Sequence, residues 1–431
     1  MSSAEIIILC FILFFIMAFT GIPITFSLLL SSVGGLYFSD ISIMVVAHRL
    51  YEGINSFPLL AVPFFLLAGR LITSAGVSQD LVNLSESLIG PLRGALAHIN
   101  VLVSMFFAGI SGSSTADTAG IGSIMIPAML KKGYPKDYTV AVTAASSTLG
   151  VIIPPSLLMV IYGCMGGVSV GALLIGGIIP GILVGLSQMG LNVIYSRRHG
   201  FPRGEPWNVK KIFINLRRAI LPLGVPIIIV GGIMGGIFTP TEAGVIAVIY
   251  SLMIIVLYKS MNPSMIWNVF SESVTFYVRV MFCVATASIF AWLLTIHHVP
   301  DLVGETIRSI TMNKFFVFLL IIVAYLIIGL FMDAVPAIII MLPIVQPLAD
   351  SVGIDQIHLG VASVAALAIG LITPPYGLCL LLASDLANIP ITRTLRVTFL
   401  FVVVMTLILI LIGAVPGLVL FIPKLTLPFM K

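Results

Sequence analysis

Residues 109–156 hold the segments that decide the fold, which read GISGSSTADTAG at 109–120, KKGYPKD at 131–137 and TLGVIIPPS at 148–156. When the chain is aligned with itself at an offset of 220 positions, without a gap, several glycines and prolines of this stretch fall on glycines and prolines. These residue types set backbone shape and break helices, so their coincidence indicates that one backbone geometry is required twice. The coinciding positions are Gly109 with Gly329, Pro127 with Pro347, Gly133 with Gly353, Gly150 with Gly370, and Pro154–Pro155 with Pro374–Pro375.

The duplication predicts a transport function as well as a fold. Helix breakers at corresponding places in two halves of an apolar chain are typical of secondary transporters, whose binding sites form where broken helices meet near the middle of the bilayer. Backbone exposed at that depth is tolerated only where protein or a water-filled cavity receives it. We therefore expect residues 109–156 and their counterparts to form the binding site.

The composition is that of a polytopic membrane protein. Of 431 residues, 59% are hydrophobic and 9% are charged, whereas soluble domains carry about 25% charged residues. Apolar runs of about 17 to 28 residues recur along the chain, and each can cross a hydrocarbon core of roughly 30 Å. The longest polar stretch is about 20 residues, too short for a soluble catalytic or substrate-capturing domain, and nothing resembles a P-loop.

Charge and cysteine content exclude other classes. The net charge of +5 lies in short loops, where it reports membrane orientation and not binding of nucleic acid. The four cysteines lie in apolar surroundings and have neither metal-ligand spacing nor a disulfide pattern. We therefore expect a protein surrounded by membrane lipid, with no nucleic-acid partner, no enzymatic activity and no metal other than a transported ion.

Each half of the chain is expected to contain the same series of helices. Residues 94–130 are compatible with two full spans or one re-entrant hairpin, and the duplicated segment at 315–349 favours the hairpin. A tandem proline interrupts one span in each half, at 138–163 and at 357–383, because it removes two amide donors inside a helix. Uninterrupted spans are expected at about 5–20, 22–38, 57–75 and 168–195, and at about 219–238, 241–258, 266–296 and 397–422.

The number of spans predicts an inverted repeat. Each half has five spans, counting the interrupted one, plus one hairpin, so the second half enters the membrane from the opposite side. Charge agrees, because the loop at 131–137 has three lysines against one acid while its counterpart at 350–355 has only acids. The first loop is then cytoplasmic and both termini are periplasmic. The expected domains are a first repeat at 1–196, a cytoplasmic basic linker at 197–218 and a second repeat at 219–431.

Oxygen atoms gather at the predicted tips and breaks. Serine and threonine residues at 111–115 supply hydroxyl oxygens, and the unwound backbone at 150–155 supplies free carbonyl oxygens. Such neutral oxygens near half-helix ends suit Na⁺, although small residues also allow close packing of membrane helices. The mirrored sodium set is Gly329 and Asp333 with Gly370 and Thr373. Candidate substrate contacts at the same tips and breaks are Ser113, Thr115, Ser156 and Tyr376.

Two acidic residues are expected at membrane depth, where an ionisable side chain is a functional candidate. Asp117 and Asp333 do not correspond at the 220 offset, since Asp333 falls on Ser113. Asp333 follows the first arm of the second hairpin, and we expect it to bind a cation or to stabilise that hairpin. Asp117 is equally compatible with capping a helix that begins at Thr118. Arg70 is expected to extend its charged end toward the cytoplasmic surface.

Four motifs also carry a family resemblance. They are FFAGISGSSTADTAGIGSIMIPAMLKKGYPKDYTVAVTAASSTLGVIIPPS at 106–156, GLFMDAVPAIIIMLPI at 329–344, GLITPPYG at 370–377 and GIFTPTEAG at 236–244. Together they resemble the large membrane subunit of tripartite ATP-independent periplasmic (TRAP) transporters, over essentially the whole chain.

The resemblance implies an elevator-type Na⁺ symporter in the bacterial inner membrane, which receives an organic acid anion from a soluble periplasmic substrate-binding protein. It also implies a small four-span membrane subunit as a separate partner. The usual substrates of the family are C4-dicarboxylates, sialic acid and related carboxylates, and the overall likeness leans toward sialic acid. The family's sodium sites fall on Ser111, Ser114, Gly150 and Pro154, and on Gly329, Gly370 and Thr373.

Two alternatives remain open from the sequence. The first is a stand-alone Na⁺/dicarboxylate or anion symporter that needs neither partner. The second is an intramembrane aspartyl protease that uses Asp117 and Asp333. Neither acid has the Tyr-Asp or Gly-x-Gly-Asp context of such proteases, and a protease would leave the duplication unexplained.

Overall fold

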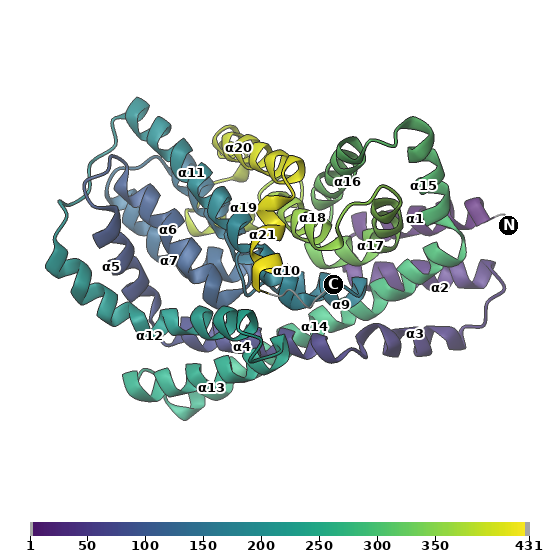
Figure 1. Ribbon diagram of the computed structural model, residues 1–431, viewed down its shortest axis with the longest axis horizontal. Helices are drawn as coiled ribbons and strands as arrows, with labels where there is room; N and C mark the ends of the chain where they lie inside the picture. The colour runs from purple at the N-terminus through teal and green to yellow at the C-terminus, as the bar shows by residue number, and fades with distance from the viewer. Residues whose placement is uncertain (1–2, 427–431) are drawn as a thin grey trace.

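The protein is an elongated body of closely packed helices, and its N-terminal helices lie at one end of the long axis (Figure 1). The computed structural model describes residues 3–426. Within that range every regular element is a helix, apart from a single bridge between Arg93 and Arg203. Seven of the described helical stretches are long and apolar enough to cross a membrane. The expected class, an all-helical polytopic membrane protein, is therefore confirmed.

The helices form two series, and the loop at 200–208 separates them. The first series is α1 (Ser3–Phe19), α2 (Ile24–Phe38), α3 (Met44–Ile54), η1 (Phe57–Leu60), α4 (Ala61–Ser74), α5 (Ser78–Ile89), α6 (Ala95–Ser111), α7 (Ser114–Lys131), α8 (Lys136–Ser147), η2 (Thr148–Val151), α9 (Leu157–Gly166), α10 (Val170–Gly176) and α11 (Ile178–His199). The second is α12 (Val209–Met234), α13 (Pro240–Tyr258), α14 (Pro263–Ile296), α15 (Val299–Ile310), α16 (Lys314–Gly329), α17 (Ala334–Ser351), α18 (Gln356–Gly370), α19 (Leu378–Leu386), η3 (Ile391–Arg393), α20 (Leu395–Ala414) and α21 (Gly417–Thr426).

Helix bounds repeat at the offset found in the sequence. The bounds of α7 and α17 correspond at both ends, and α8 and α18 begin at corresponding residues. A short tip joins the paired helices in each half, formed by Gly112 and Ser113 between α6 and α7 and by residues 330–333 between α16 and α17. Gly112 has a φ of +63°, a left-handed conformation that ends a helix and favours glycine. The membrane orientation of the two series stays a prediction.

One helix in each half is interrupted where the tandem prolines lie. In the first half α8 continues as η2 and the chain resumes as α9, and in the second half α18 stops and α19 begins after a turn. Proline has no amide hydrogen and cannot continue the helical ladder. The Pro154–Pro155 and Pro374–Pro375 bonds are both cis.

The two halves interlock at these interrupted helices. The second segment of the first interrupted helix, α9, packs against α17 and α18 of the other half. In the same way α19 packs against α7 and α8. Each hairpin is thus covered by a helix from the opposite half of the chain.

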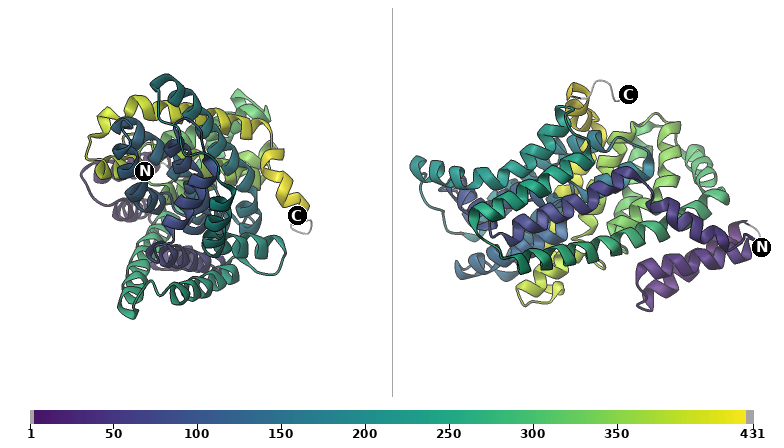
Figure 2. Two further views of the ribbon diagram at one scale, coloured as in Figure 1. Left: turned by 90° about the vertical axis from the view of Figure 1, so that its left-hand side faces the viewer. Right: turned by 90° about the horizontal axis from the view of Figure 1, so that it is seen from below.

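Long helices frame one side of this interlocked centre. α4 packs against α13 and α14, while α14 also contacts α2, α3 and α17. α12 lies against α13, α5 and α6. Viewed from below, these long helices lie in front of the hairpins (Figure 2). They form a layer against which the hairpin region packs.

The structure differs from the expected elements in three places. The helix α3 was not expected, because His48, Arg49 and Glu52 give it a polar face that no apolar run reveals; both basic residues contact Glu52. The basic linker at 197–218 is largely helical, since α11 and α12 extend into it. The expected last span at 397–422 is two helices, α20 and α21, because Pro416 separates them.

Candidate functional site

The first hairpin tip is a buried polar turn. Ser111 ends α6, and its hydroxyl donates a hydrogen bond to the Oδ1 atom of Asp117 on α7. The backbone nitrogen of Ser113 donates to the Ser111 hydroxyl oxygen at 3.3 Å. Ser111, Ser114 and Asp117 are all buried, and Asp117 is fully so. The tip therefore holds a carboxyl group and several hydroxyl groups away from bulk solvent.

Two oxygen atoms of this tip have no hydrogen-bond partner among residues 3–426. They are the Oδ2 atom of Asp117 and the Oγ atom of Ser114, both buried. Buried polar atoms in folded proteins are nearly always paired, so an exception calls for a physical reason. A bound cation would supply the missing interaction, since carboxylate and hydroxyl oxygens are ligands that hard cations prefer. The residues present therefore fit a Na⁺ ion.

The first break lies directly against this tip. A Cβ atom added to Gly150 would stand 2.5 Å from the Asp117 Oδ2 atom and 2.9 Å from the Ser113 carbonyl carbon. The backbone nitrogen of Leu157 donates to the Gly112 carbonyl oxygen at 3.2 Å, which joins the start of α9 to the tip. Glycine at position 150 thus allows the unwound backbone to approach Asp117.

In the second half, backbone atoms of the hairpin tip lie close to backbone atoms of the interrupted helix. A Cβ atom on Gly370 would stand 2.7 Å from the Gly329 carbonyl oxygen. The backbone nitrogen of Tyr376 donates to the Leu330 carbonyl oxygen at 2.9 Å. The hydroxyl of Thr373 donates to the Ile369 carbonyl oxygen at 2.7 Å, within the last turn of α18. The predicted members of the second sodium set thus lie at this contact.

Asp333 has a different role in local structure from Asp117. It is the residue that precedes α17, and its Oδ1 atom accepts a hydrogen bond from the Ala334 backbone nitrogen at 2.7 Å. Ser113, its counterpart at the 220 offset, precedes α7 in the same extended conformation. Each hairpin thus brings one carboxyl group to its tip, at positions that do not correspond.

A cavity of about 120 Å³ lies between the two tips. Ser113, Ser114 and Thr115 line it from the first tip, and Asp333 lines it from the second. Phe276 of α14 contributes an apolar wall. The structure therefore brings together residues from both hairpins and from the framing layer.

Not every predicted substrate residue reaches this cavity. Ser113 and Thr115 do, and their hydroxyl oxygens lie 3.1 Å apart. Ser156 is fully buried, and its hydroxyl donates to the Val151 carbonyl oxygen and accepts from the Met159 backbone nitrogen at the start of α9. Tyr376 lies at the second break and does not line the cavity.

Arg70 and Glu242 interact with residues outside the two hairpins. Arg70 contacts Glu272 of α14, with 3.4 Å between nitrogen and oxygen, and its guanidinium lies over the Phe276 ring. Glu242 caps α13, where it accepts from the backbone nitrogen and the hydroxyl of Thr239. Part of the GIFTPTEAG motif lines a separate cavity of about 580 Å³ beside the start of α10.

The sequence left two features of the site open. It gave Asp117 a capping role as readily as a functional one, and it did not identify Phe276 as a wall. The distance of six residues between Ser111 and Asp117, across a glycine that reverses the chain, is the signal that pairs them. Phe276 comes from a distant helix, so local sequence carries no sign of its position.

Residues 11–418 match the family described as the DctM component of the tripartite ATP-independent periplasmic transporters. The chain belongs to this family. It is 38% identical over 426 residues to the "Uncharacterized protein YgiK" of Salmonella typhimurium, with 98% of each chain covered. It is 35% identical to the 2,3-diketo-L-gulonate TRAP transporter large permease protein YiaN of Escherichia coli, covering 93% of this chain and 94% of that one.

A solved structure supports the fold of this TRAP large subunit. The YdaH transporter of Alcanivorax borkumensis superposes with a TM-score of 0.60 over 89% of each chain, at 17% sequence identity. The relatives with named functions are transporter permeases and not enzymes. The hypothesis of an intramembrane aspartyl protease is therefore wrong.

Proposed function

We propose that this TRAP large subunit couples a Na⁺ gradient to the import of an organic acid anion. The observation that carries the coupling is the pair of buried oxygens, Ser114 Oγ and Asp117 Oδ2, that lack partners beside the unwound backbone at Gly150. Membership of the DctM family supports the transport role itself.

Two groups of residues would hold the coupling ions. The first is the tip and break of the first half, with Ser111, Ser114, Gly150 and Pro154 as predicted and Asp117 added from the structure. The second comprises Gly329, Asp333, Gly370 and Thr373.

The electrostatics of the cavity favour binding of the cation before the anion. Asp333 lines the cavity, and an anionic substrate beside an uncompensated carboxylate would be repelled. A bound Na⁺ neutralises that charge, and the N-termini of α7 and α17 add partial positive charge near the same space. Ion binding would thus create the anion site.

The substrate class is best described as an organic acid anion. Further relatives at 33 to 37% identity are named as permeases for isethionate, sialic acid and C4-dicarboxylates. These names do not single out the sialic acid type that the overall likeness suggested. A cavity of about 120 Å³ with hydroxyl groups and one aromatic wall suits a small polar anion.

We further propose two partners and a mode of movement. A small membrane subunit and a soluble periplasmic binding protein would complete the transporter, because the polar stretches of this chain are too short to capture a scarce solute. The interlocked hairpins would carry ion and substrate across together, against the layer formed by α4, α12, α13 and α14. From the number of spans and the charge of the loops, we propose that both termini face the periplasm.

Uptake by reconstituted protein tests the proposal. The chain would be placed in proteoliposomes with or without its small subunit and binding protein, and a panel of radiolabelled organic acids would be offered with and without an inward Na⁺ gradient. We expect accumulation of one or more anions only when Na⁺ and both partners are present.

Three other results would contradict parts of this proposal, and the first of them would favour the stand-alone symporter. Strong Na⁺-driven uptake by the chain alone would favour a stand-alone symporter and remove the need for partners. Preference for a neutral or cationic solute would contradict the anion site. Uptake that ignores Na⁺ would remove the ion-coupling assignment of Ser114 and Asp117.

A further inference from the structure

A third cavity, at the start of α6, carries strong positive charge. It has a volume of about 580 Å³ and is separate from the cavity between the hairpin tips. Three arginines line it and no acidic side chain does. The lining residues are Pro91, Leu92, Arg93, His98, Val193, Arg197 and Arg203.

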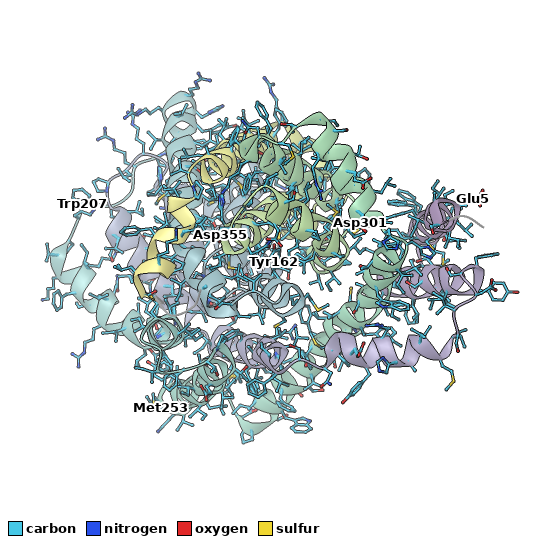
Figure 3. The ribbon with its side chains drawn as sticks, turned by 45° about the vertical axis from the view of Figure 1, so that its right-hand side comes forward. Glu5, Tyr162, Trp207, Met253, Asp301 and Asp355 are labelled. Atoms are coloured by element: carbon cyan, nitrogen blue, oxygen red, sulfur yellow. The ribbon has the colours of Figure 1, made fainter. Side chains whose placement is uncertain are left out.

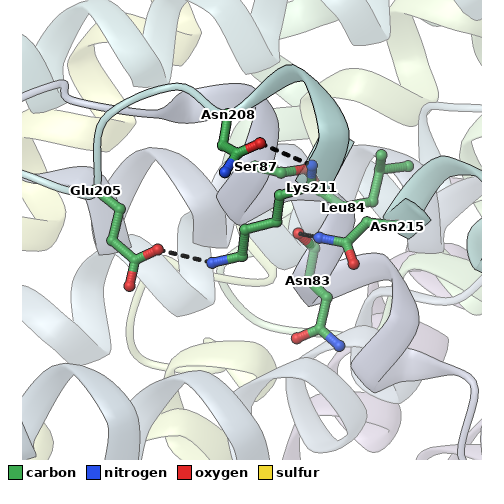
Figure 4. Close-up of polar contacts among 7 residues, drawn as sticks. All are labelled: Asn83, Leu84, Ser87, Glu205, Asn208, Lys211 and Asn215. Carbon is green, nitrogen blue, oxygen red and sulfur yellow. Dashed lines mark hydrogen bonds and ion pairs between the residues drawn. The ribbon is translucent and has the colours of Figure 1, made fainter. Parts of the chain in front are cut away.

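The arginines of this cavity are not neutralised by neighbouring acids. None of Arg93, Arg197 and Arg203 forms an ion pair with a residue in the described range 3–426. The acid nearest in sequence, Glu205, instead accepts from the Lys211 Nζ atom at 2.7 Å (Figure 4). That hydrogen bond lowers the pKa of Glu205 and so favours its charged, lysine-paired form. The positive charge is thus available to a ligand.

The backbone holds two of these arginines side by side. Arg93 and Arg203 form an antiparallel bridge. The backbone nitrogen of Gly94 donates to the Pro202 carbonyl oxygen at 2.9 Å. The backbone nitrogen of Gly204 donates to the Leu92 carbonyl oxygen at 3.2 Å. Gly94 has a φ of +71°, so glycine is favoured where the chain turns into α6. These backbone contacts therefore fix the positions of Arg93 and Arg203 relative to each other.

A buried histidine supplies an independent sign of a ligand. His98, in the first turn of α6, is 1% exposed and lines the cavity. Its Nε2 atom is buried and has no hydrogen-bond partner among the described residues. The other ring nitrogen is hydrogen-bonded to the Arg93 backbone, so the protonated imidazole is the form that donates from Nε2, and a phosphate oxygen would accept. The first-turn amides of α6 add partial positive charge to the same place.

The surroundings of the cavity match a phospholipid. Leu92 lines the cavity and is exposed, and the neighbouring face of α11 exposes Leu186 and Ile194. α11 thus contributes to the cavity lining and also exposes apolar side chains that can contact acyl chains. The basic segment predicts that this end of the molecule is cytoplasmic, where anionic lipids concentrate.

We propose that this cavity binds the phosphate group of an anionic phospholipid of the cytoplasmic leaflet. The three arginines Arg93, Arg197 and Arg203 contact the phosphate oxygens. The Nε2 atom of His98 donates a further hydrogen bond to the phosphate. The occupied site ties the start of the first hairpin and the end of α11 to the membrane surface.

Lipid titration of the purified full-length chain tests this assignment. The unfolding midpoint in neutral detergent would be followed while phosphatidylglycerol, phosphatidylcholine or inorganic phosphate is added. The variant R93Q/R197Q/R203Q removes the charges that line the cavity. The matched control R198Q/R217Q/R218Q removes the same charge at residues of the basic segment 197–218 that do not line the cavity.

We expect phosphatidylglycerol to raise the midpoint of the wild type and of the control. The cavity variant should bind this lipid about a hundredfold more weakly, roughly fivefold for each arginine. Its midpoint in phosphatidylcholine should match the wild type, which shows that it is folded. An equal loss in the control would overturn the site in favour of general surface charge. An equal effect of inorganic phosphate would assign the cavity to a free anion and overturn the lipid.

Discussion

At the scale of single residues, the approach of Gly150 to Asp117 is the tightest feature of the candidate ion site. The carboxyl group of Asp117 uses one oxygen for Ser111 and presents the other toward the unwound backbone. Gly150 is not among the residues with positive φ, so its requirement for glycine comes from space and not from backbone conformation. Alanine at position 150 therefore probes the contact of the break with both Asp117 and the Ser113 backbone.

We predict that Gly150→Ala weakens apparent Na⁺ affinity about tenfold or more. The added methyl group would overlap the Asp117 Oδ2 atom, and relieving that overlap costs about 1 to 3 kcal/mol in a packed interior. Na⁺-dependent changes in the unfolding midpoint would measure the affinity. Gly190→Ala on α11 is the control, because no heavy atom lies within 4 Å of its Cβ position. Unchanged Na⁺ affinity in Gly150→Ala would take this contact out of the ion site.

Residue identity alone could predict part of the site. The hydroxyl groups and the broken backbone were visible in the sequence, because serine, glycine and proline act through local geometry. Ser156 shows the limit, since its hydroxyl caps α9 and is not free for substrate. Whether a serine caps or binds depends on the conformation of its neighbours, which composition does not report.

At the scale of helices, the two hairpins are attached differently to their interrupted partners. In the first half, Asn100 donates to the Thr143 hydroxyl at 2.7 Å, and the Ser104 and Ser146 hydroxyls lie 2.9 Å apart. At the 220 offset, Asn100 and Ser104 correspond to Leu320 and Ala324. The first hairpin is therefore joined to α8 by buried hydrogen bonds between side chains. In the second half the corresponding hydrogen bonds come from Gln356, the first residue of α18, which donates to the Gln346 carbonyl oxygen and to the Asp350 carboxylate of α17.

We predict that the loops after the two hairpins lie on opposite sides of the membrane. Lys132 directly follows α7 and Ser351 is the last residue of α17, and both are exposed. In closed vesicles of one orientation, an impermeant maleimide should modify only one of Lys132→Cys and Ser351→Cys. Lys136→Cys, in the same loop as Lys132, should behave like Lys132→Cys. Labelling of both loops from one side would contradict the inverted repeat.

Helix bounds were more predictable than helix packing. Glycines and tandem prolines at one offset predict the tips and breaks, because these residues favour helix ends. Pro127 and Pro347 show the limit, since they lie inside α7 and α17. The helix α3 escapes prediction because His48 and Arg49 pair with Glu52 of the same helix, so its sequence contains no long apolar run. The contacts of α9 with α17 could not be foreseen, because packing between distant helices depends on the whole surface of each.

At the scale of the whole molecule, most large side chains of the centre belong to one continuous core. Tyr162 of α9 is fully buried at the middle of the molecule, while Trp207 in the connecting loop lies at the periphery (Figure 3). The core includes residues of both helix series. The series are therefore parts of one folding unit and not two independent domains.

We predict that neither half is stable without the other. A chain cut in the exposed loop at 200–208 should assemble and retain Na⁺ binding when both fragments are made together. Either fragment made alone should be degraded or precipitate, because α7, α9, α17 and α19 would each lose a packing partner. Recovery from detergent extracts and size-exclusion elution would measure this. A monodisperse first fragment on its own would argue against interlocking.

The interlocked packing also sets an order of events during synthesis. The ribosome completes α9 well before α17, its partner, has been made. At roughly 5 to 20 residues per second, translation leaves that surface uncovered for on the order of 10 s or longer. During this interval the face of α9 that later packs against α17 must be covered by lipid, by the insertion machinery or by a chaperone. Cells that translate slowly or lack such shelter would lose this protein to proteolysis before its second half arrives.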